Sequence, residues 1–471
     1  MFKSIFNTFA NCFKIPELKS RILFTLLVLA VCRLVYMLPI PGLDGTALKE
    51  YFDALPKDEG GSLLGMYSMF TGGALERCAV GSLGIMPYIS ATIIIQLLTA
   101  VIPSLSKLSR EEGGRVKIIQ YGRYLTVLLC LGQGLVMAIG WENASNIFQG
   151  FQGKLVLYDN VWWYRIQTTI VLTSATLLLM WLGEQITERG IGNGISLVIT
   201  IGILARLPHA SQALLTMFVP PEGVERQYDW RHGAMLVILL GVVIAAVIAV
   251  TQAQRKIPVQ YAQRAVGRKV YAGGSSFMPL RVNYAGVMPI IFAQAILMFP
   301  GKIFELLGKT LKGAGGEAAW RITMGQFFEK LSIYFHEGSF FYIMSFGLMI
   351  LFFSYFWVAT QFNELQISDD LKKYGGYIPG VRPGPKTSEF LHNTMSRITL
   401  SGAIFLTAIA VMPILMNRAM KIPYEVATFF GGTSILIMVG VMLDTMRQME
   451  SHLMMRHYDG FLKKGRIKGR M

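Results

Sequence analysis

Long apolar runs alternate with short polar or glycine-rich stretches along the whole chain. A helix needs about 20 apolar residues to cross the roughly 30 Å hydrocarbon core of a bilayer, and each run is close to that length. Because a helix satisfies its own backbone hydrogen bonds, each run is predicted as a membrane-spanning α-helix. Ten spans are predicted, at 22–41, 79–101, 118–140, 164–184, 194–216, 233–254, 286–308, 339–362, 398–417 and 427–446. The expected fold class is an all-α polytopic membrane protein.

Composition agrees with this fold class. The 471 residues are 53% hydrophobic and 15% charged, with a mean hydropathy of +0.47, and a soluble domain of this length would carry more charge. The first run, RILFTLLVLAVCRLVYMLPIP, is too long for the apolar region of a signal peptide and lacks a small-residue cleavage site. It is therefore predicted as a span.

Lysine and arginine are distributed unevenly between the two sides of the membrane. The chain has 44 of these residues and a formal net charge of +16. Cytoplasmic loops are enriched in lysine and arginine, and the larger share lies in the termini and in the loops on their side. Both termini are therefore predicted in the cytoplasm, where anionic lipid would account for most of the positive excess.

The spans divide into two sets of five. Halves with an odd number of spans cross the membrane in opposite senses, and inverted repeats of this kind place a pathway at their interface. A long external loop is also expected at about 302–338. The predicted organisation is an N-terminal half at 1–216, an external connection at 217–232, a C-terminal half at 233–446 and a basic cytoplasmic tail at 447–471.

Two long cytoplasmic loops, 254–285 and 363–397, have unusual sequences. The first is basic and has no acidic residue, and its KIPVQYA and RKVYA stretches predict a β-hairpin. Its charge suits lipid headgroups, RNA or an acidic protein without choosing among them. In the second, GYIPGVRPGPKT places Arg382 before Pro383 on a stiff loop. That guanidinium would bind a partner's carboxylate or phosphate, or simply face solvent.

The sequence contains no recognisable constellation for catalysis or metal binding. The four cysteines and six histidines are scattered, without a C-x-x-C or H-E-x-x-H pattern. The glycine-rich MWLGEQITERGIGNGIS stretch lacks the G-K-[ST] of a phosphate-binding loop. A membrane enzyme would need a paired nucleophile and base or a set of metal ligands. We therefore expect no metal, no cofactor and no enzymatic activity.

The segment GIMPYISATIII, residues 84–95, combines a proline with several isoleucines. Ile85 and Ile89 are four residues apart and share a helix face. That face would contact lipid, or it would form a constriction that closes a pore by dewetting. The preceding GSLLGMYSMFTGGALERCAVGSL is either a half-helix that stops at Gly72–Gly73 or an ordinary re-entrant loop, since non-helical backbone at membrane depth must line protein or water.

Five motifs, in this order, resemble the bacterial SecY family, the central subunit of the Sec protein-conducting channel: GIMPYISATIIIQLL, MWLGEQITERGIGNGIS, NYAGVMPIIFA, YIPGVRPG and FGGTSILI. The resemblance covers nearly the whole chain, and its specificity comes from the combination of motifs. It implies ten helices in two inverted halves around an hourglass pore. Unfolded secretory polypeptides would cross through this pore, and apolar segments would leave it sideways into the lipid.

The resemblance also implies sites along the pore. A ring of apolar side chains would close the centre, and Pro87 would shape the span that lines it. A plug, at about 61–77, would close the external funnel. A lateral gate would lie between the second and third spans on one side and the seventh and eighth on the other. The matching residues are Ile85, Ile89, Ile199, Ile291 and Ile437 in the ring, Gly65, Phe70, Thr71, Gly72 and Gly73 in the plug, and Ser90 and Phe299 at the gate, with Gln96 and Asn283 as polar candidates near them.

The two cytoplasmic loops would be the docking surface for the SecA ATPase and the ribosome. Arg382 matches a position needed for SecA-driven export, Arg268 and Lys269 match a ribosome-contacting pair, and Arg255 and Lys256 belong to the same surface. Further implied partners are SecE-type and SecG-type subunits, signal peptides, nascent chains, membrane lipids and accessory insertase or Sec membrane proteins. The implied location is the cell inner membrane.

A secondary transporter for a small solute is the main alternative, since it would also have ten spans and glycine-broken helices. Transporters usually place ionisable residues at mid-membrane for coupling. Here most spans lack them, and those within or at the ends of spans are Arg33, Glu184, Glu364 and Asp444. The sequence therefore favours the channel.

Overall fold

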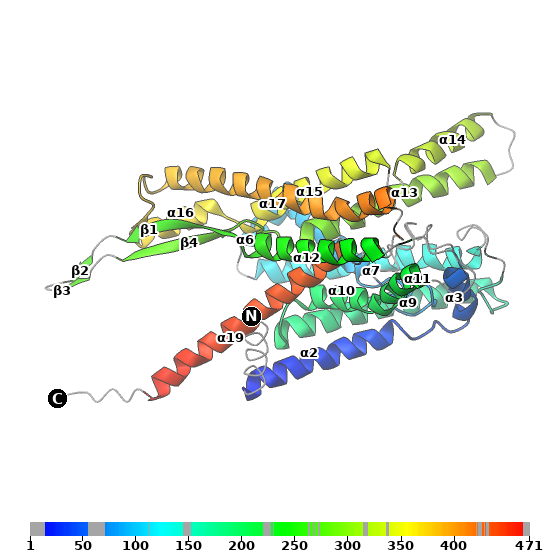
Figure 1. Ribbon diagram of the computed structural model, residues 1–471, viewed down its shortest axis with the longest axis horizontal. Coiled ribbons are helices and arrows are strands. Elements are labelled where there is room, and N and C mark those ends of the chain that lie inside the picture. Colours follow the sequence, from blue (N-terminus) through cyan, green and yellow to red (C-terminus); the bar gives the residue numbers. More distant parts are fainter. Residues whose placement is uncertain are drawn as a thin grey trace. The chain divides into compact units, whose positions relative to one another are not determined.

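The chain folds into two units, and Figure 1 labels their helices and strands. The first comprises Met1–Ala213 and Ile437–Met471, and the second comprises Leu214–Leu436. The predicted inverted repeat of two five-span halves stays a prediction. The computed structural model describes residues 15–54, 71–111, 113–144, 151, 153–219, 228, 230–261, 264–266, 269–271, 274–313, 319–335, 339–420, 422, 426–427, 429 and 433–464.

The described part of the first unit is helical. Its helices are α2 (Pro16–Val35), α3 (Gly45–Ala54), α5 (Met86–Val101), α6 (Pro103–Arg110), α7 (Gly114–Glu142), α9 (Val161–Arg189) and α10 (Gly194–Leu204). Two further helices, α11 (Leu207–Phe218) and α19 (Thr433–Lys464), extend across the boundaries of the units.

The second unit contains helices and a small antiparallel sheet. Its helices are α12 (Trp230–Gln252), α13 (Met288–Gly313), α14 (Ala319–Tyr334), α15 (Phe340–Gln361), α16 (Glu364–Lys373) and α17 (Pro385–Met420). Its strands are β1 (Gln254–Tyr261), β2 (Arg264–Val266), β3 (Lys269–Tyr271), β4 (Ser275–Arg281) and β5 (Gly376–Tyr377).

Within the described residues, six helices are long and apolar enough to cross a membrane, and α5 with α6, bent by 105°, would make a seventh. The remaining predicted spans fall on α2, α13 and α19, which are also helices. Charged residues interrupt α2 and α19, and the described apolar part of α13 is Met288–Leu297. The predicted class of helical polytopic membrane protein is confirmed.

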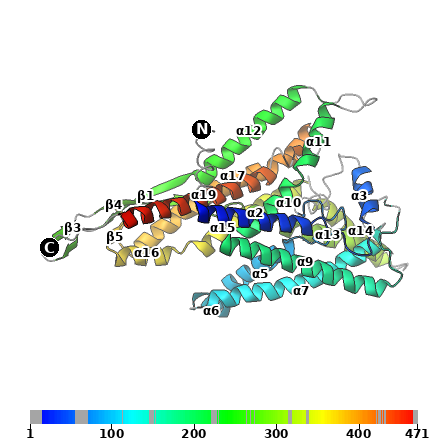
Figure 2. The same ribbon diagram turned by 90° about the horizontal axis from the view of Figure 1, so that it is seen from below.

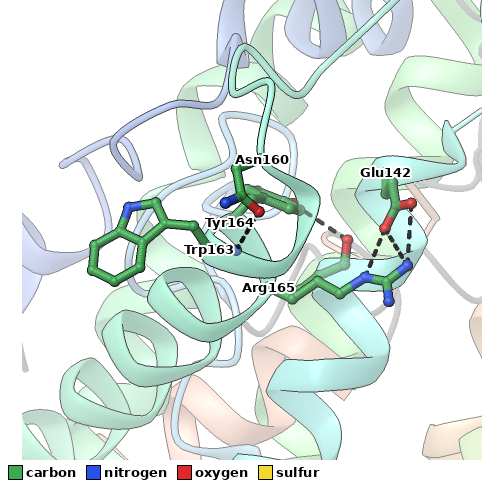
Figure 3. Close-up of polar contacts among 6 residues, drawn as sticks. Glu142, Asn160, Trp163, Tyr164 and Arg165 are labelled. Carbon is green, nitrogen blue, oxygen red and sulfur yellow. Dashed lines mark hydrogen bonds and ion pairs between the residues drawn. The ribbon is translucent and has the colours of Figure 1, made fainter.

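The packing of α7 against α9 shows how helices of the first unit are held in register (Figure 3). The Arg165 guanidinium donates to both carboxylate oxygens of Glu142, at 2.9 and 3.2 Å. The buried Tyr164 hydroxyl donates to the Ala138 carbonyl at 3.3 Å, and the Asn160 side chain caps the start of α9. Such ties fix the relative height of two helices whose apolar faces could otherwise slide.

One predicted boundary is wrong. The span predicted from residue 79 begins at Met86, because the buried residues before it form turns. Pro87 therefore lies in the first helical turn, where its missing N–H costs nothing, and not inside the span. The segment predicted as an external loop at 302–338 contains the end of α13, which continues to Gly313, and α14; its external position stays a prediction.

The first cytoplasmic loop is a β-hairpin as predicted, but its KIPVQY and KVY stretches, in β1 and β3, pair with β4 and β2 and not with each other. Strand β1 pairs with β4 along its length, Gln254 opposite Arg281, and β2 pairs with β3. From the second cytoplasmic loop, β5 joins the free edge of β1 beside α16 (Figure 2). The two loops therefore form one structure in the second unit.

Candidate functional site

The five isoleucines predicted for the ring are all buried, with at most 5% of each exposed. Ile85 precedes α5, and the Ile89 N–H one turn later donates to its carbonyl at 3.2 Å. Ile199 lies in α10 and Ile437 in α19, both in the first unit, whereas Ile291 lies in α13 of the second. Branched apolar side chains exclude water and offer no hydrogen bonds to a peptide. Their meeting in one ring stays a prediction.

Residues 71–82, here called the base segment, lead from the predicted plug into α5. Of the predicted plug residues, Thr71, Gly72 and Gly73 lie here, whereas Gly65 and Phe70 fall outside the described residues. Gly72 has φ +60°, and a Cβ there would lie 2.6 Å from Arg33 Nη1 and 3.1 Å from the Gly202 carbonyl oxygen. A larger residue would be strained at this φ and would displace the Arg33 guanidinium from the Gly72 carbonyl.

The second part of the base segment is a compact turn joined to the chain that follows α2. Ser82 Oγ donates to the carbonyls of Ala74 and Ala79, at 3.1 and 2.5 Å, which closes the turn. Backbone hydrogen bonds then connect it to its neighbour, from Ile40 N to Cys78 O at 2.9 Å and from Val80 N to Leu38 O at 2.8 Å. This part is anchored by backbone pairing.

Charged side chains make further contacts with the base segment. Arg33 Nη1 and Nη2, from α2, each lie 3.3 Å from the Gly72 carbonyl oxygen. Arg206, directly after α10, forms an ion pair with Glu76. The two side chains are only 14% and 23% exposed, so solvent screens this pair less than a surface pair.

The residues predicted for the lateral gate belong to both units. Ser90 and Gln96 are partly buried in α5, and the described residues supply no hydrogen-bond partner for the buried Gln96 Oε1. Asn283 is buried between β4 and α13. Phe299 lies in α13, where the structure describes its backbone but not its side chain. The role of these residues in a gate stays a prediction.

The ionisable residues noted at the ends of spans have ionic or polar neighbours. Glu184 binds Arg123 of α7 through both oxygens, at 2.7 and 3.2 Å. Glu364 contacts His392 Nδ1 at 2.8 Å, and Asp444 lies 3.8 Å from Arg447. The first two contacts tie α7 to α9 and α16 to α17, whereas the third lies within α19.

Strands β1, β4 and β5 with α16 and the start of α17 form a platform over an apolar cluster that includes Ile257, Leu280 and Leu391. Ile257 of β1 belongs to this cluster and Val259 is also buried, while the predicted docking residues Arg255 and Lys256 are exposed. Lys269 lies in β3, whereas Arg268 falls outside the described residues.

Arg382 is exposed on the loop between β5 and α17. Its carbonyl oxygen accepts a hydrogen bond from Thr387 Oγ1 at 2.9 Å, and the Gly384 carbonyl accepts one from the buried Ser368 Oγ at 2.7 Å. These bonds hold the backbone on both sides of Pro383 and leave the guanidinium free to extend outward. The expected stiff presentation of Arg382 therefore has a structural basis.

Comparison with known proteins decides the family. The family described as SecY matches residues 79–446. The chain belongs to the SecY family. A protein translocase subunit SecY of Thermotoga maritima is 41% identical over 471 residues, 99% of this chain and all of the relative. The predicted function, a protein-conducting channel and not an enzyme, is therefore confirmed by membership of this family.

Solved structures agree with the family fold. One described as "The structure of a protein conducting channel" has a TM-score of 0.54 at 17% identity and covers 92% of this chain and 91% of its own. Sec61 in a canine ribosome-channel complex from the endoplasmic reticulum has a TM-score of 0.53 at 17% identity, with the same coverage. At this identity the likeness shows the fold alone.

Sequence reasoning missed the charged contacts of the base segment. Arg33 stood out as a charge in an apolar run, but its partner lies 39 residues away in a glycine-rich turn. Glu76 and Arg206 are 130 residues apart, and neither lies in a motif. Only the packing of α2, α10 and the base segment brings them together.

Proposed function

We propose that this SecY-family chain passes unfolded secretory polypeptides through a central pore of the cytoplasmic membrane and releases apolar segments sideways into the lipid. The observation that carries the proposal is the base segment, folded against α2 and α10 immediately before the helix that bears Ile89. A non-helical segment at this place needs protein or water around it, which a pore entrance supplies.

In the proposed resting state, the segment at about 61–77 closes the external funnel and the isoleucine ring closes the centre. A ring of branched side chains holds a narrow apolar gap dry, and ions do not cross a dry gap. During transport the same side chains would fit around an extended peptide without binding its backbone. Transport would therefore depend little on the sequence of the polypeptide.

A lateral gate formed by Ser90, Gln96, Asn283 and Phe299 would let a signal peptide reach lipid. The polar groups of Gln96 and Asn283 would exchange partners when the gate opens. A sufficiently apolar segment then gains free energy by moving from the pore into the bilayer, whereas a polar chain continues across.

The platform of the second unit would dock the SecA ATPase or the ribosome. The exposed Arg255, Lys256 and Arg382 offer charge-assisted hydrogen bonds to carboxylates or phosphates, and Arg268 and Lys269 would extend this surface. SecE-type and SecG-type subunits and accessory membrane proteins would complete the complex. The platform lies on the cytoplasmic side in this proposal, with both termini, following the lysine and arginine bias of the loops.

The test places a photo-crosslinking residue at Ile437 and presents a ribosome-stalled chain that carries a signal peptide. Adducts at Ile437 and none at Leu128, a residue of α7 that is 66% exposed, would put the polypeptide in the pore. If an engaged complex gave no adduct at Ile437, the ring would be ordinary packing. Solute uptake by vesicles containing only this chain would then favour a transporter.

A further inference from the structure

Helices α14 and α15 carry a run of exposed apolar side chains, here called the heptad stripe. Its members recur every seven residues: Trp320, Phe327, Tyr334, Phe341, Leu348 and Tyr355. Each is at least 36% exposed. The break between the two helices does not interrupt the stripe, because the rings of Tyr334 and Phe341 meet with their centroids 6.3 Å apart. A seven-residue apolar repeat is the spacing at which one helix packs along another.

The opposite side of α14 packs against α13. The Phe304 ring of α13 stacks on Phe328 with centroids 6.0 Å apart and also contacts Phe335 at 5.6 Å. A Cβ on Gly308 would lie 3.3 Å from the Gly325 carbonyl oxygen, so the two backbones approach closely. Helix α14 is therefore held firmly by α13, and it presents the heptad stripe on its exposed side.

Helix α15 is long enough to cross a bilayer without α14. Its 22 residues extend about 33 Å at roughly 1.5 Å per residue, against a hydrocarbon core of roughly 30 Å. Near its start, α13 packs on α15, where the Phe292 and Phe353 rings lie 5.7 Å apart. Further along, α13 packs on α14, which lies beyond the start of α15 (Figure 1). Helix α14 therefore stands outside the hydrocarbon core, among headgroups and water.

The side chains beside the heptad stripe change from α14 to α15, whereas the stripe does not. In α14 the exposed polar neighbours are Thr323, Gln326, Glu329 and Lys330. In α15 the exposed neighbours include the apolar Phe340, Met344 and Phe352. Lipid would account for the whole apolar face of α15. It would not account for a narrow aromatic stripe between polar residues outside the core, which is typical of a surface that binds protein.

We propose that the heptad stripe binds a membrane-anchored partner protein through one apolar α-helix, which crosses the bilayer beside α15 and continues outside it along α14. The partner helix would carry its own apolar residues at heptad spacing and insert them between those of the stripe. Ser345, four residues after Phe341 on the same face, is small enough to let it approach closely. Lys330, exposed beside the stripe, would pair with an acidic residue of the partner.

This surface differs from the ring and from the platform, and its occupation needs no exported polypeptide. The inference therefore goes beyond the proposed function. Crosslinking at Ile437, which tests that function, can succeed or fail whichever result the heptad stripe gives.

The test uses the full chain in the membranes of the cell that makes it. A photo-crosslinking residue replaces one stripe residue at a time, at Phe327, Tyr334 or Leu348. The matched controls carry it at Thr323, Gln326 or Lys330, which are exposed on α14 beside the stripe. We expect a protein adduct of one mass from all three stripe positions, also when no secretory protein is being exported, and loss of that adduct at the controls. A shared adduct at Phe327 and Leu348 requires one partner that lies both outside and inside the bilayer.

A second variant tests whether the contact on α14 contributes to binding. With the photo-crosslinking residue at Leu348, Phe327→Glu should lower the yield of the adduct by roughly tenfold or more, since an aromatic residue at the centre of an interface carries much of its binding energy. Gln326→Glu adds the same charge at the next residue and should keep the yield. Both side chains are exposed, so neither change disturbs the packing of α14 on α13.

Four outcomes would overturn the inference. Adducts with lipid alone at all stripe positions would mean that the bilayer covers the stripe. An adduct of twice the mass of the chain would mean a second copy. An adduct that forms only during export would assign the stripe to the exported polypeptide. The absence of a protein adduct at Phe327 and Tyr334 would mean that α14 faces water.

Discussion

Gln448 Oε1 in α19 accepts a hydrogen bond of 2.8 Å from the backbone N–H of Gly192, in the turn between α9 and α10. The next turn residue towards α9, Ile191, donates its N–H to Thr25 Oγ1 of α2 at 3.1 Å. Polar side chains of two helices thus satisfy the N–H groups of a turn that enters α10. Since α10 carries Ile199 and α19 carries Ile437, the turn sets the heights of two predicted ring residues.

Replacement of Gly192 by alanine should destabilise the first unit. Gly192 has φ +90°, and its added Cβ would lie 2.9 Å from Thr445 Oγ1 of α19. Backbone strain of this kind costs about 1–3 kcal/mol, and the steric contact adds to it. Gly113→Ala is the control, since Gly113 has φ +79° with no atom within 4 Å of the new Cβ. Thermal unfolding in detergent should show a larger decrease for Gly192→Ala, and equal decreases would contradict the role of the contact.

The carboxyl group of Asp44 predicts how the stability of the protein changes at acidic pH. Hydrogen bonds from the Thr46 hydroxyl and then from the Thr46 N–H hold the pKa of this carboxyl below its usual value. Its contribution to stability is therefore present at neutral pH and is lost as pH falls below about 4, through the lowered pKa. Asparagine accepts the same bonds without titrating. The unfolding temperature of Asp44→Asn should fall less than that of wild type between pH 6 and pH 3, and parallel curves would refute this explanation.

Hydrophobic runs were sufficient to predict where helices form, because a long apolar segment in a bilayer satisfies its backbone hydrogen bonds by forming an α-helix. The hairpin of the first cytoplasmic loop was also predictable, since β1 alternates exposed Lys256 and Pro258 with buried Ile257 and Val259. These features depend on residues close together in sequence.

The sequence-based predictions failed or were missing where side chains are buried by other parts of the protein and not by lipid. Residues 71–85 are mostly buried by protein, so their composition resembles the span that follows although their backbone forms turns. Contacts between distant charges, such as Glu76 with Arg206, depend on tertiary packing and have no local signature. The ring positions came from family resemblance, since an isoleucine facing a pore and one facing lipid have the same sequence pattern.

Arg382→Glu should abolish SecA-driven export while membrane insertion from the ribosome continues. The loop backbone is held by Thr387 and Ser368, so the change should alter charge at the tip without unfolding the platform. Lys117→Glu, which reverses an exposed positive charge in α7 outside the platform, is the control and should keep export. ATP-dependent export by inverted vesicles measures the effect. Normal export by Arg382→Glu would remove this residue from the docking surface.

Ile89→Asn and Ile437→Asn should each make the resting channel leak. Both isoleucines are buried, at 5% and 1% exposure, and burying an unpaired amide costs about 1–3 kcal/mol, so the constriction would take up water. Ion conductance in planar bilayers should rise by about tenfold or more, since 1.36 kcal/mol corresponds to a factor of ten. Leu128→Asn, on an exposed face of α7, places the same amide towards lipid and should leave the seal intact. Equal conductance in all three variants would mean that the isoleucines do not form the seal.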